Sequence, residues 1–231
     1  MNIDLCKPLE LPNEFVNRLK AIENSCIDEQ FSESLIEQCS VYALVRDIDQ
    51  YCRSNRIIGI HYTRAMPESI RSQGLLVRDG ETIRDTFLNE HGHLFTQKEI
   101  LEIKNRWKNY FNHNQSSIRN NRIFFNFTES ALGGEGTKHL LELYGGEQVS
   151  MCFELDDPIG LKLGKIGAPI VVRCSLNPNQ VETFTEYPWG KILVSSFHKL
   201  INPNAYGIDQ DGYQIIPVSS KDIIEIRILK N

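Results

Sequence analysis

The stretch Ile57-Ile58-Gly59-Ile60-His61-Tyr62-Thr63-Arg64 decides both the fold class and the search for a functional site. Its apolar, β-branched beginning is typical of a buried strand. We expect this strand to end in four polar groups, an imidazole, a phenol, a hydroxyl and a guanidinium, which together can line a binding cleft. The alternative is that His61 and Arg64 only cap the strand and pair with neighbouring groups.

A short helix is predicted directly after this strand, over residues 67–73. Pro67 suits the first turn of a helix, because the N–H that proline lacks would have no intrahelical partner there. Gly74 can end the helix in a left-handed conformation. The strand, its polar end and the helix therefore form one local unit that can present a site.

Composition restricts the class of protein. The chain has 231 residues, 41% of them hydrophobic, and a net charge of −5, which is enough for an ordinary core. No apolar run approaches the ~20 residues that span a bilayer, and residues 1–7 lack the pattern of a secretory signal. The six cysteines form no C-x-x-C pair, and the isolated His91-x-His93 lacks a second ligand pair, so we expect reduced thiols and no metal. These features indicate a cytoplasmic protein with no membrane partner.

Two parts are predicted: a helical segment over residues 1–55, packed on an α+β body over residues 56–231. In the first part, hydrophobic periodicity indicates helices over residues 13–22 and 32–51. In the body, strands are predicted at 57–62, 123–127, 149–155, 170–176, 213–218 and 223–229, and helices at 81–90, 96–111 and 139–144. Residues 112–121 read as a loop, and 188–200 fit either strand or helix. Because regular crossover helices do not separate the strands, a mixed or mainly antiparallel sheet is expected.

Two local patterns sharpen these predictions. Thr96 with Glu99 three residues later is a capping box that opens the helix at residue 96. Isoleucines at 223, 224, 226 and 228 favour a strand with one well-buried face.

Several common site motifs are absent from the sequence. There is no Walker phosphate loop, no G-x-G-x-x-G and no G-x-S-x-G. The run Leu132-Gly133-Gly134-Glu135-Gly136 lacks a following lysine, so it is either a flexible loop or a phosphate contact.

Four segments resemble the histidine-containing branch of the ADP-ribosyltransferase superfamily, which includes diphtheria-type toxins, poly-ADP-ribose polymerases and bacterial DNA-modifying toxins. The segment His61-Tyr62-Thr63, followed by Gly74-Leu75, resembles the family's first core strand and short helix. Residues 123–127, followed by Ser130-Ala131, resemble its second core strand, and residues 214–218 and 222–229 resemble its last strands. The resemblance covers residues 57–229 and implies a split mixed or antiparallel sheet.

The chain departs from the family pattern at three places. Tyr62 stands where the family often has glycine, and phenylalanine replaces the usual tyrosine of the second strand. Gln214 occupies the late-strand place of the family's glutamate. We assign the acid to Glu147, at the start of the strand predicted from residue 148, because two preceding glycines expose it; Glu129 and Glu135 are the reserves.

The resemblance implies that the substrate is NAD, whose nicotinamide–ribose bond breaks with an oxocarbenium-like ribose. Glu147 would stabilise the developing positive charge, and His61 would position the dinucleotide. The implied NAD-binding residues are Tyr62, Thr63, Arg64, Phe125, Ser130 and Gln214, with Arg64 on the diphosphate and an aromatic ring on nicotinamide. For each named residue the alternative is structural: a solvated acid, a surface ion pair or a core aromatic.

The implied function is a mono-ADP-ribosyltransferase, of the kind found in toxins and antiphage effectors, that modifies a nucleic acid or protein acceptor. An antitoxin protein is a further expected partner. The alternatives are an NAD glycohydrolase, an enzyme resembling RNA 2′-phosphotransferases, or a non-catalytic nucleotide- or protein-binding module.

A basic segment, residues 98–122, lies between the first two predicted core strands. It carries six Lys and Arg residues against two Glu, a charge of 6 − 2 = +4, with Trp107, Tyr110 and Phe111 interleaved. Cations on phosphates and aromatic rings on bases suit a nucleic-acid strand. The alternative is an amphipathic helix with a solvated basic face.

Overall fold

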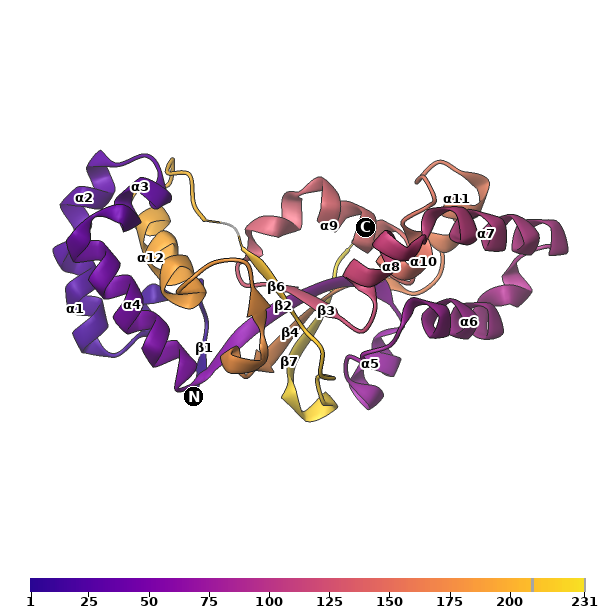
Figure 1. Cartoon of the computed structure of the whole chain (residues 1–231), viewed down its shortest axis with the longest axis horizontal. Helices are drawn as coiled ribbons and strands as arrows, with labels where there is room; N and C mark the ends of the chain where they lie inside the picture. The colour runs from indigo at the N-terminus through magenta and orange to yellow at the C-terminus, as the bar shows by residue number, and fades with distance from the viewer. Residues whose placement is uncertain (209, 231) are drawn as a thin grey trace. The chain divides into compact units, whose positions relative to one another are not determined.

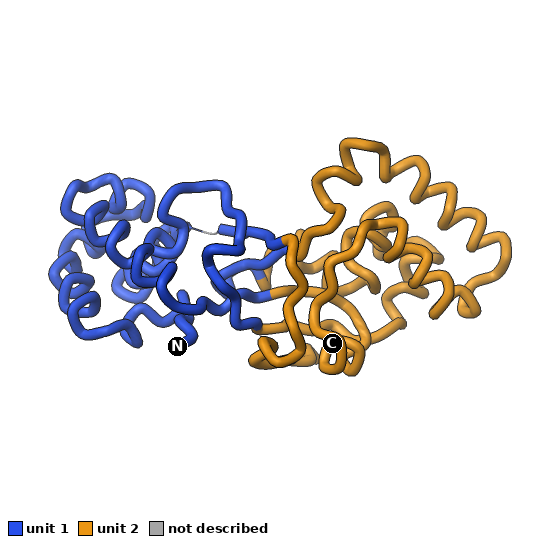
Figure 2. The backbone as a smooth tube through the Cα atoms, turned by 60° about the horizontal axis from the view of Figure 1, so that its bottom comes forward, with its two compact units in different colours: residues 1–60, 124–131, 174–214 blue, residues 61–123, 132–173, 215–231 orange. Residues whose placement is uncertain are grey.

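The computed structural model describes residues 1–208 and 210–230, which form two compact units (Figure 2). Unit 1 comprises residues 1–60, 124–131 and 174–214, and unit 2 comprises residues 61–123, 132–173 and 215–231. Each unit is therefore assembled from segments far apart in the sequence. The boundary predicted after residue 55 stays a prediction, because compactness alone does not test which part folds by itself.

Unit 1 combines helices with part of the sheet (Figure 1). Its helices are α1 (Asn13–Ala21), α2 (Glu23–Asp28), α3 (Ser32–Glu37), α4 (Cys39–Arg53) and α12 (Pro188–Ile201), with 3-10 turns η1 (Pro8–Glu10) and η4 (Pro178–Gln180). Its strands include β1 (Asn2–Ile3), β5 (Glu182–Thr183) and β6 (Asp211–Gln214). β2 (Arg56–Ala65), β3 (Ile123–Asn126) and β4 (Ala168–Leu176) each run through both units, as does the 3-10 turn η3 (Glu129–Gly133).

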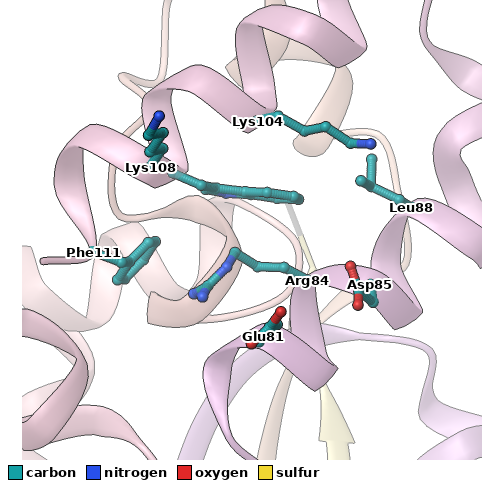
Figure 3. A pocket seen from close by; sticks show the side chains of 8 residues that line it. Glu81, Arg84, Asp85, Leu88, Lys104, Lys108 and Phe111 are labelled. Atoms are coloured by element: carbon teal, nitrogen blue, oxygen red, sulfur yellow. The ribbon is translucent and has the colours of Figure 1, made fainter. Parts of the chain in front are cut away.

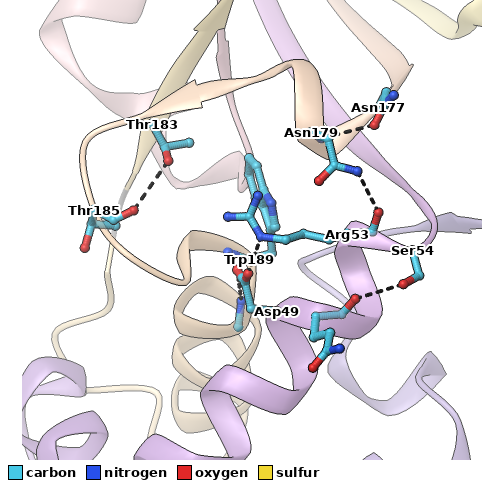
Figure 4. A network of polar contacts seen from close by, with 10 residues as sticks. Asp49, Arg53, Ser54, Asn177, Asn179, Thr183, Thr185 and Trp189 are labelled. Atoms are coloured by element: carbon cyan, nitrogen blue, oxygen red, sulfur yellow. Dashed lines mark hydrogen bonds and ion pairs between the residues drawn. The ribbon is translucent and has the colours of Figure 1, made fainter.

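Helices α4 and α12 pack side by side in unit 1 (Figure 1). Gly190 permits their close approach, since a Cβ at this position would lie 1.9 Å from the Val45 carbonyl oxygen. The buried carboxylate of Asp49 accepts hydrogen bonds from the backbone N–H groups of Trp189 (3.0 Å) and Gly190 (3.5 Å), and from Arg53 Nε (2.7 Å) (Figure 4). An acid of α4 thus satisfies donors that the first turn of α12 leaves without intrahelical partners.

The sheet of unit 1 contains both strand directions. β1 pairs with β2 in parallel, with Ile3 opposite Ile57, whereas β2 and β3 pair antiparallel, with Ile60 opposite Asn126. β5 and β6 are also antiparallel. Gly59 leaves room for neighbouring core side chains: a Cβ there would lie 2.3 Å from Leu176 and 3.1 Å from Phe125.

Unit 2 carries most of the remaining helices. They are α5 (Pro67–Gln73), α6 (Gly80–His91), α7 (Gln97–Tyr110), α8 (His113–Arg119), α9 (Glu135–Glu142), α10 (Glu147–Ser150) and α11 (Pro158–Leu163), with 3-10 turns η2 (Gly92–Leu94) and η5 (Ser220–Asp222). The strand β7 (Ile223–Ile228) also belongs to this unit. Side chains of α6, α7, α10 and α11, among them Phe87, Trp107, Val149 and Ile159, form its hydrophobic core.

Several predictions of local structure are confirmed. The helix after β2 spans Pro67–Gln73, and Gly74 follows with a φ of 77°. A Cβ at Gly74 would lie 2.0 Å from the Val218 carbonyl oxygen, so only glycine fits where this turn meets the C-terminal segment. The capping box of Thr96 and Glu99 is present at the start of α7. The strands predicted at 123–127 and 170–176 are observed as β3 and β4.

The described strands form a seven-stranded sheet in the order β5-β6-β3-β2-β4-β7, with β1 paired to β2 outside this path. With helices in both units, the chain is an α+β protein with mixed strand directions, as predicted from its sequence. In the described part of the chain, no helix combines the length and apolar character needed to cross a membrane.

Four local predictions were wrong. Residues 149–155 form no strand, because Val149 and Phe153 lie four residues apart and enter the core from α10 and the turn after it. A short apolar run fits either element, and here tertiary packing selects the helix. The predicted loop 112–121 contains α8, capped by Asn112, and the helix predicted over 32–51 is broken at Gln38 into α3 and α4.

The fourth error concerns the isoleucine-rich C-terminal strand. β7 is an edge strand in the sheet order, and Ile224 and Ile228 are 47% and 52% exposed, so it lacks the expected well-buried face. The segment 188–200, which the sequence left open, is helical and forms most of α12.

Candidate functional site

The strand β2 carries four of the predicted site residues, His61 to Arg64, but they do not form its end. The strand continues to Ala65, so all four lie within it. Successive side chains of a strand point to opposite faces, which puts His61 with Thr63 on one face and Tyr62 with Arg64 on the other. His61 is half-buried, and Tyr62 and Thr63 are buried. The predicted polar cluster is therefore divided between two faces.

Arg64 is buried in unit 2, and its guanidinium donates hydrogen bonds to backbone carbonyl groups. Its Nε donates to the Ile166 oxygen at 2.8 Å, Nη1 to Leu141 at 3.4 Å and Nη2 to Gly167 at 3.3 Å. Burial lowers the pKa of its guanidinium. All three nitrogen atoms have partners in the fold, which favours a structural role for Arg64 over the predicted contact with a diphosphate.

The turn that precedes Glu147 is hydrogen-bonded to β2, the strand that carries His61 and Arg64. Arg64 and Tyr144 form an isolated parallel bridge, and the Gly145 N–H donates to the Arg64 carbonyl oxygen at 3.2 Å. Gly145 and Gly146 have φ values of 89° and 62°, so two successive residues adopt a backbone that glycine accommodates best. The two glycines thus turn the chain sharply beside β2, three residues along the strand from His61.

Glu147 begins the short helix α10, where the sequence predicted the start of a strand. Its side chain is 37% exposed, and its carboxylate lies 2.8 Å from Arg119 Nε at the end of α8. The acid is half-buried rather than fully exposed beside the two glycines, and its charge is neutralised by Arg119, a partner that was not predicted from the sequence.

A second pair of contacts joins the same elements one residue further along. Gln148 Nε2 donates to Asn120 Oδ1 at 3.1 Å, and the same oxygen accepts the Gly80 N–H at 2.9 Å. Gln148 Oε1 accepts a hydrogen bond from Arg84 Nη1 at 3.1 Å. The buried side chain of Gln148 thereby connects the helix that starts with Glu147 to the first turns of α6.

The remaining predicted site residues belong to unit 1. Phe125 of β3 is 1% exposed and packs against the backbone of Gly59, as a core residue does. Ser130 is exposed, and its hydroxyl lies within hydrogen-bond distance of the Thr128 hydroxyl. Gln214 is the last residue of β6 and is buried. Phe125 and Gln214 thus lie on β3 and β6, which are neighbours in the sheet order.

A pocket of about 280 Å³ lies between α6 and α7 in unit 2. Figure 3 shows Lys104 and Lys108 on one side and Glu81, Arg84 and Asp85 on the other, with the Arg84 side chain extending toward Phe111. Leu88 and Trp107 complete the lining. The pocket therefore combines three cations, two carboxylates and two aromatic rings.

Arg84 is held in place by its neighbours. Its Cζ lies 4.5 Å from the centre of the Phe111 ring and 5.9 Å from that of Trp107, and Gln148 accepts its hydrogen bond. The Trp107 indole is fixed in turn, since its Nε1 donates to the Val149 carbonyl oxygen at 2.9 Å. Burial lowers the pKa of Arg84, and Glu81, Asp79 and Asp85 act against that shift.

The charges of the basic segment 98–122 are used in two different ways. Arg106 pairs with Glu102 and Asp157, and Arg119 pairs with Glu147. Lys104 and Lys108 are exposed, and within residues 1–208 and 210–230 neither has an acid within 4.0 Å. The two lysines of the pocket therefore keep their charge available to a ligand.

The α6 side of this pocket was not predicted from the sequence. Glu81, Arg84, Asp85 and Leu88 have the spacing i, i+3, i+4, i+7, and so do Lys104, Trp107, Lys108 and Phe111. Residues with this spacing share one face of a helix. The signal was present on both helices, but only packing shows that the two faces meet.

Comparison of the chain with protein-family models, curated proteins and solved structures found no match in any of the three.

Proposed function

We propose that the protein is an NAD-dependent mono-ADP-ribosyltransferase with Glu147 as its catalytic acid. The observation that carries the proposal is the hydrogen bond from the Gly145 N–H to the Arg64 carbonyl oxygen. It attaches the turn before Glu147 to the strand of His61. His61 and Arg64 are three residues apart, roughly 10 Å along a strand, a span over which one dinucleotide can contact both regions.

The arrangement of strands also supports this proposal. Within unit 1, Ile60 pairs with Asn126, so the first and second strands of the family resemblance are antiparallel neighbours. β6, which ends at Gln214, is next to β3 in the sheet order. Three of the four pieces, those on β2, β3 and β6, thus belong to adjacent strands, whereas β7 pairs with β4 at the other end of the sheet order.

In the proposed reaction, the bond between nicotinamide and ribose breaks, and nicotinamide leaves with the bonding electrons. The Glu147 carboxylate stabilises the positive charge that develops on the ribose and accepts a hydrogen bond from its 2′-hydroxyl. His61 positions the substrate by a hydrogen bond. A nucleophile of the acceptor then forms the new bond to the ribose carbon and loses its proton. For this role, Arg119 has to release the Glu147 carboxylate when NAD binds.

A second candidate is a nucleotide-binding module without catalysis. The Arg119–Glu147 ion pair favours it, because a neutralised carboxylate stabilises a developing cation less well. Gln214, an amide at the late-strand place of the family's acid, favours it too. The two candidates differ in whether nicotinamide is released.

The decisive experiment measures nicotinamide release from NAD by the purified protein. Glu147→Gln keeps the size of the side chain and removes its charge, so we expect release to fall at least about a hundredfold while the fold is retained. Glu142→Gln on α9 is the matched control and should leave the rate unchanged. Absence of release by the wild type would favour the binding module, and an active Glu147→Gln variant would exclude this acid.

His61 should affect binding rather than bond breaking. We expect His61→Ala to weaken NAD binding about tenfold in a calorimetric titration, as loss of one positioning hydrogen bond does. Unchanged affinity would show that the half-buried imidazole is structural. Transfer of label from adenylate-labelled NAD to RNA, DNA or protein then separates a transferase from a glycohydrolase.

A further inference from the structure

We propose that the pocket between α6 and α7 binds one nucleotide unit of a single-stranded nucleic acid. Its volume of about 280 Å³ lies near the lower limit of small-ligand pockets, which suits one base with its phosphate. Four lining residues come from α6, and four at the same spacing come from α7 and from Phe111, which directly follows it. Nothing in the proposed reaction at Glu147 uses these side chains.

The phosphate is bound by Lys104 and Lys108. Both lie one turn apart on α7, line the pocket and are exposed, and the described part of the chain offers neither of them an ion-pair partner. Their charge is therefore not neutralised by an ion pair within the fold, whereas Arg106 and Arg119 each pair with a carboxylate. Lysine ammonium groups that neutralise phosphates release counterions and give binding that weakens with salt.

The base stacks on the surface formed by Arg84 and Phe111. The guanidinium lies 4.5 Å from the centre of the Phe111 ring, and its bond to Gln148 holds it there. Planar guanidinium groups and aromatic rings are the surfaces on which unpaired bases stack. Because these bonds preorganise Arg84, stacking does not require the side chain to be ordered on binding.

Glu81 and Asp85 complete the site on the α6 side. Carboxylates accept hydrogen bonds from the N–H groups of a base edge, such as the exocyclic amine of cytosine. An acidic peptide would offer negative charge to the lysines but no base to stack on Arg84 and Phe111. An unpaired base with its phosphate matches all three features of the pocket: cations, a flat stacking surface and acceptors.

The claim that this pocket holds the acceptor of the reaction rests on the proposed function. The claim that it binds a nucleotide does not. Gln148 contacts Arg84 and follows Glu147 directly in α10, so one short helix joins the pocket to the proposed catalytic acid. The acceptor of the transferase would then be a nucleic acid.

The test measures binding of a fluorescent single-stranded 12-mer to the full chain, without NAD, by anisotropy at several salt concentrations. The variant Lys104→Gln/Lys108→Gln should bind at least about tenfold more weakly. Its slope of log affinity against log salt should be smaller by about 0.7, since the one phosphate held by the two lysines contributes about 0.7 for single strands. The control Lys98→Gln/Lys138→Gln makes the same change in net charge outside the pocket and should keep the wild-type affinity within about twofold.

A second pair of variants tests the base. Phe111→Leu removes the aromatic ring and should weaken binding about tenfold, whereas Phe111→Tyr should retain it. With an abasic 12-mer the effect of Phe111→Leu should disappear, while that of the lysine pair remains. RNA and DNA 12-mers show whether the 2′-hydroxyl is recognised.

Equal losses in the lysine pair and its control would overturn the proposal, as would equal competition by duplex DNA or by a poly-glutamate peptide. The outcome is separable from catalysis. Lysine-dependent binding without nicotinamide release retains the pocket and rejects the transferase, and nicotinamide release without such binding does the reverse.

Discussion

At the scale of single residues, the strand β2 illustrates how one polar run serves different purposes. Arg64 points to the face of the strand opposite that of His61, and its guanidinium is bonded to three carbonyl groups of unit 2. His61, half-buried on the other face, is the residue of this run that stays with the proposed site. Two cationic or basic side chains three residues apart thus have separate roles.

Replacing Arg64 should cost stability. Arg64→Met keeps much of the apolar stem but leaves three carbonyl oxygens without their donor, so we expect a loss of about 2–4 kcal/mol in the free energy of unfolding. Urea denaturation of the variant measures this loss, with Arg46→Met, an exposed arginine of α4, as the control. A loss of stability below about 0.5 kcal/mol together with lost NAD binding would instead support the predicted contact of Arg64 with the diphosphate of NAD.

At the scale of elements, α7 shows how a helix terminus depends on distant parts of the chain. Thr96 and Glu99 cap its first turn, and Lys162 of α11 lies 2.8 Å from the Glu99 carboxylate. The hydrogen bond from Lys162, followed by those from Thr96, lowers the pKa of Glu99 from 4.5 to about 2. The local capping box and the tertiary ion pair therefore act on one carboxylate.

The stabilisation by Glu99 should disappear in acid. Because the pKa is lower in the folded chain than in the unfolded one, the ionised carboxylate stabilises the fold fully above about pH 5 and ceases to do so as the pH falls toward 2. The difference in unfolding free energy between wild type and Glu99→Gln should shrink over this range. Chemical denaturation between pH 2.5 and 6 measures it; the matched control is Glu14→Gln, in the first turn of α1. A difference independent of pH would refute the role of the ion pair.

At the scale of the whole molecule, the two compact units share strands. β2 and β4 each contribute residues to both units, so unfolding of either unit would remove part of the sheet of the other. Each unit also contains a thiol that is shielded from solvent: Cys26 and Cys52 are buried in unit 1, where Cys39 is exposed, and Cys152 is half-buried in unit 2. Burial raises the pKa of Cys26 and of Cys152 to about 11.

Cysteine labelling should therefore report cooperative unfolding. In the native protein we expect a maleimide to modify exposed Cys39 quickly and Cys52 hardly at all, because a buried thiol is neither accessible nor ionised. Through a urea titration, Cys52 of unit 1 and Cys152 of unit 2 should become reactive at the same midpoint, as followed by mass spectrometry. Separate midpoints would show that the units unfold independently despite their shared strands.

The sequence by itself determined the α+β class, the helix Pro67–Gln73 with its terminal glycine, the capped start of α7 and the strands β3 and β4. Each of these features is set by residues only a few positions apart, through hydrophobic periodicity, a proline without an N–H, or a capping side chain. Where an apolar run was short, as at Val149–Phe153, the same residues fitted two elements and only packing could choose.

Tertiary structure alone decided what the polar residues contact. In the folded chain, Arg64 donates hydrogen bonds to three carbonyl groups, and Glu147 forms an ion pair with Arg119. The α6 face with Arg84 meets the α7 face with Lys104 and Lys108. The partners in each case lie between about 20 and about 100 residues apart in the chain. Local sequence indicates which side chains share a face, but not which distant face they meet, because that depends on how the whole chain buries its apolar surface.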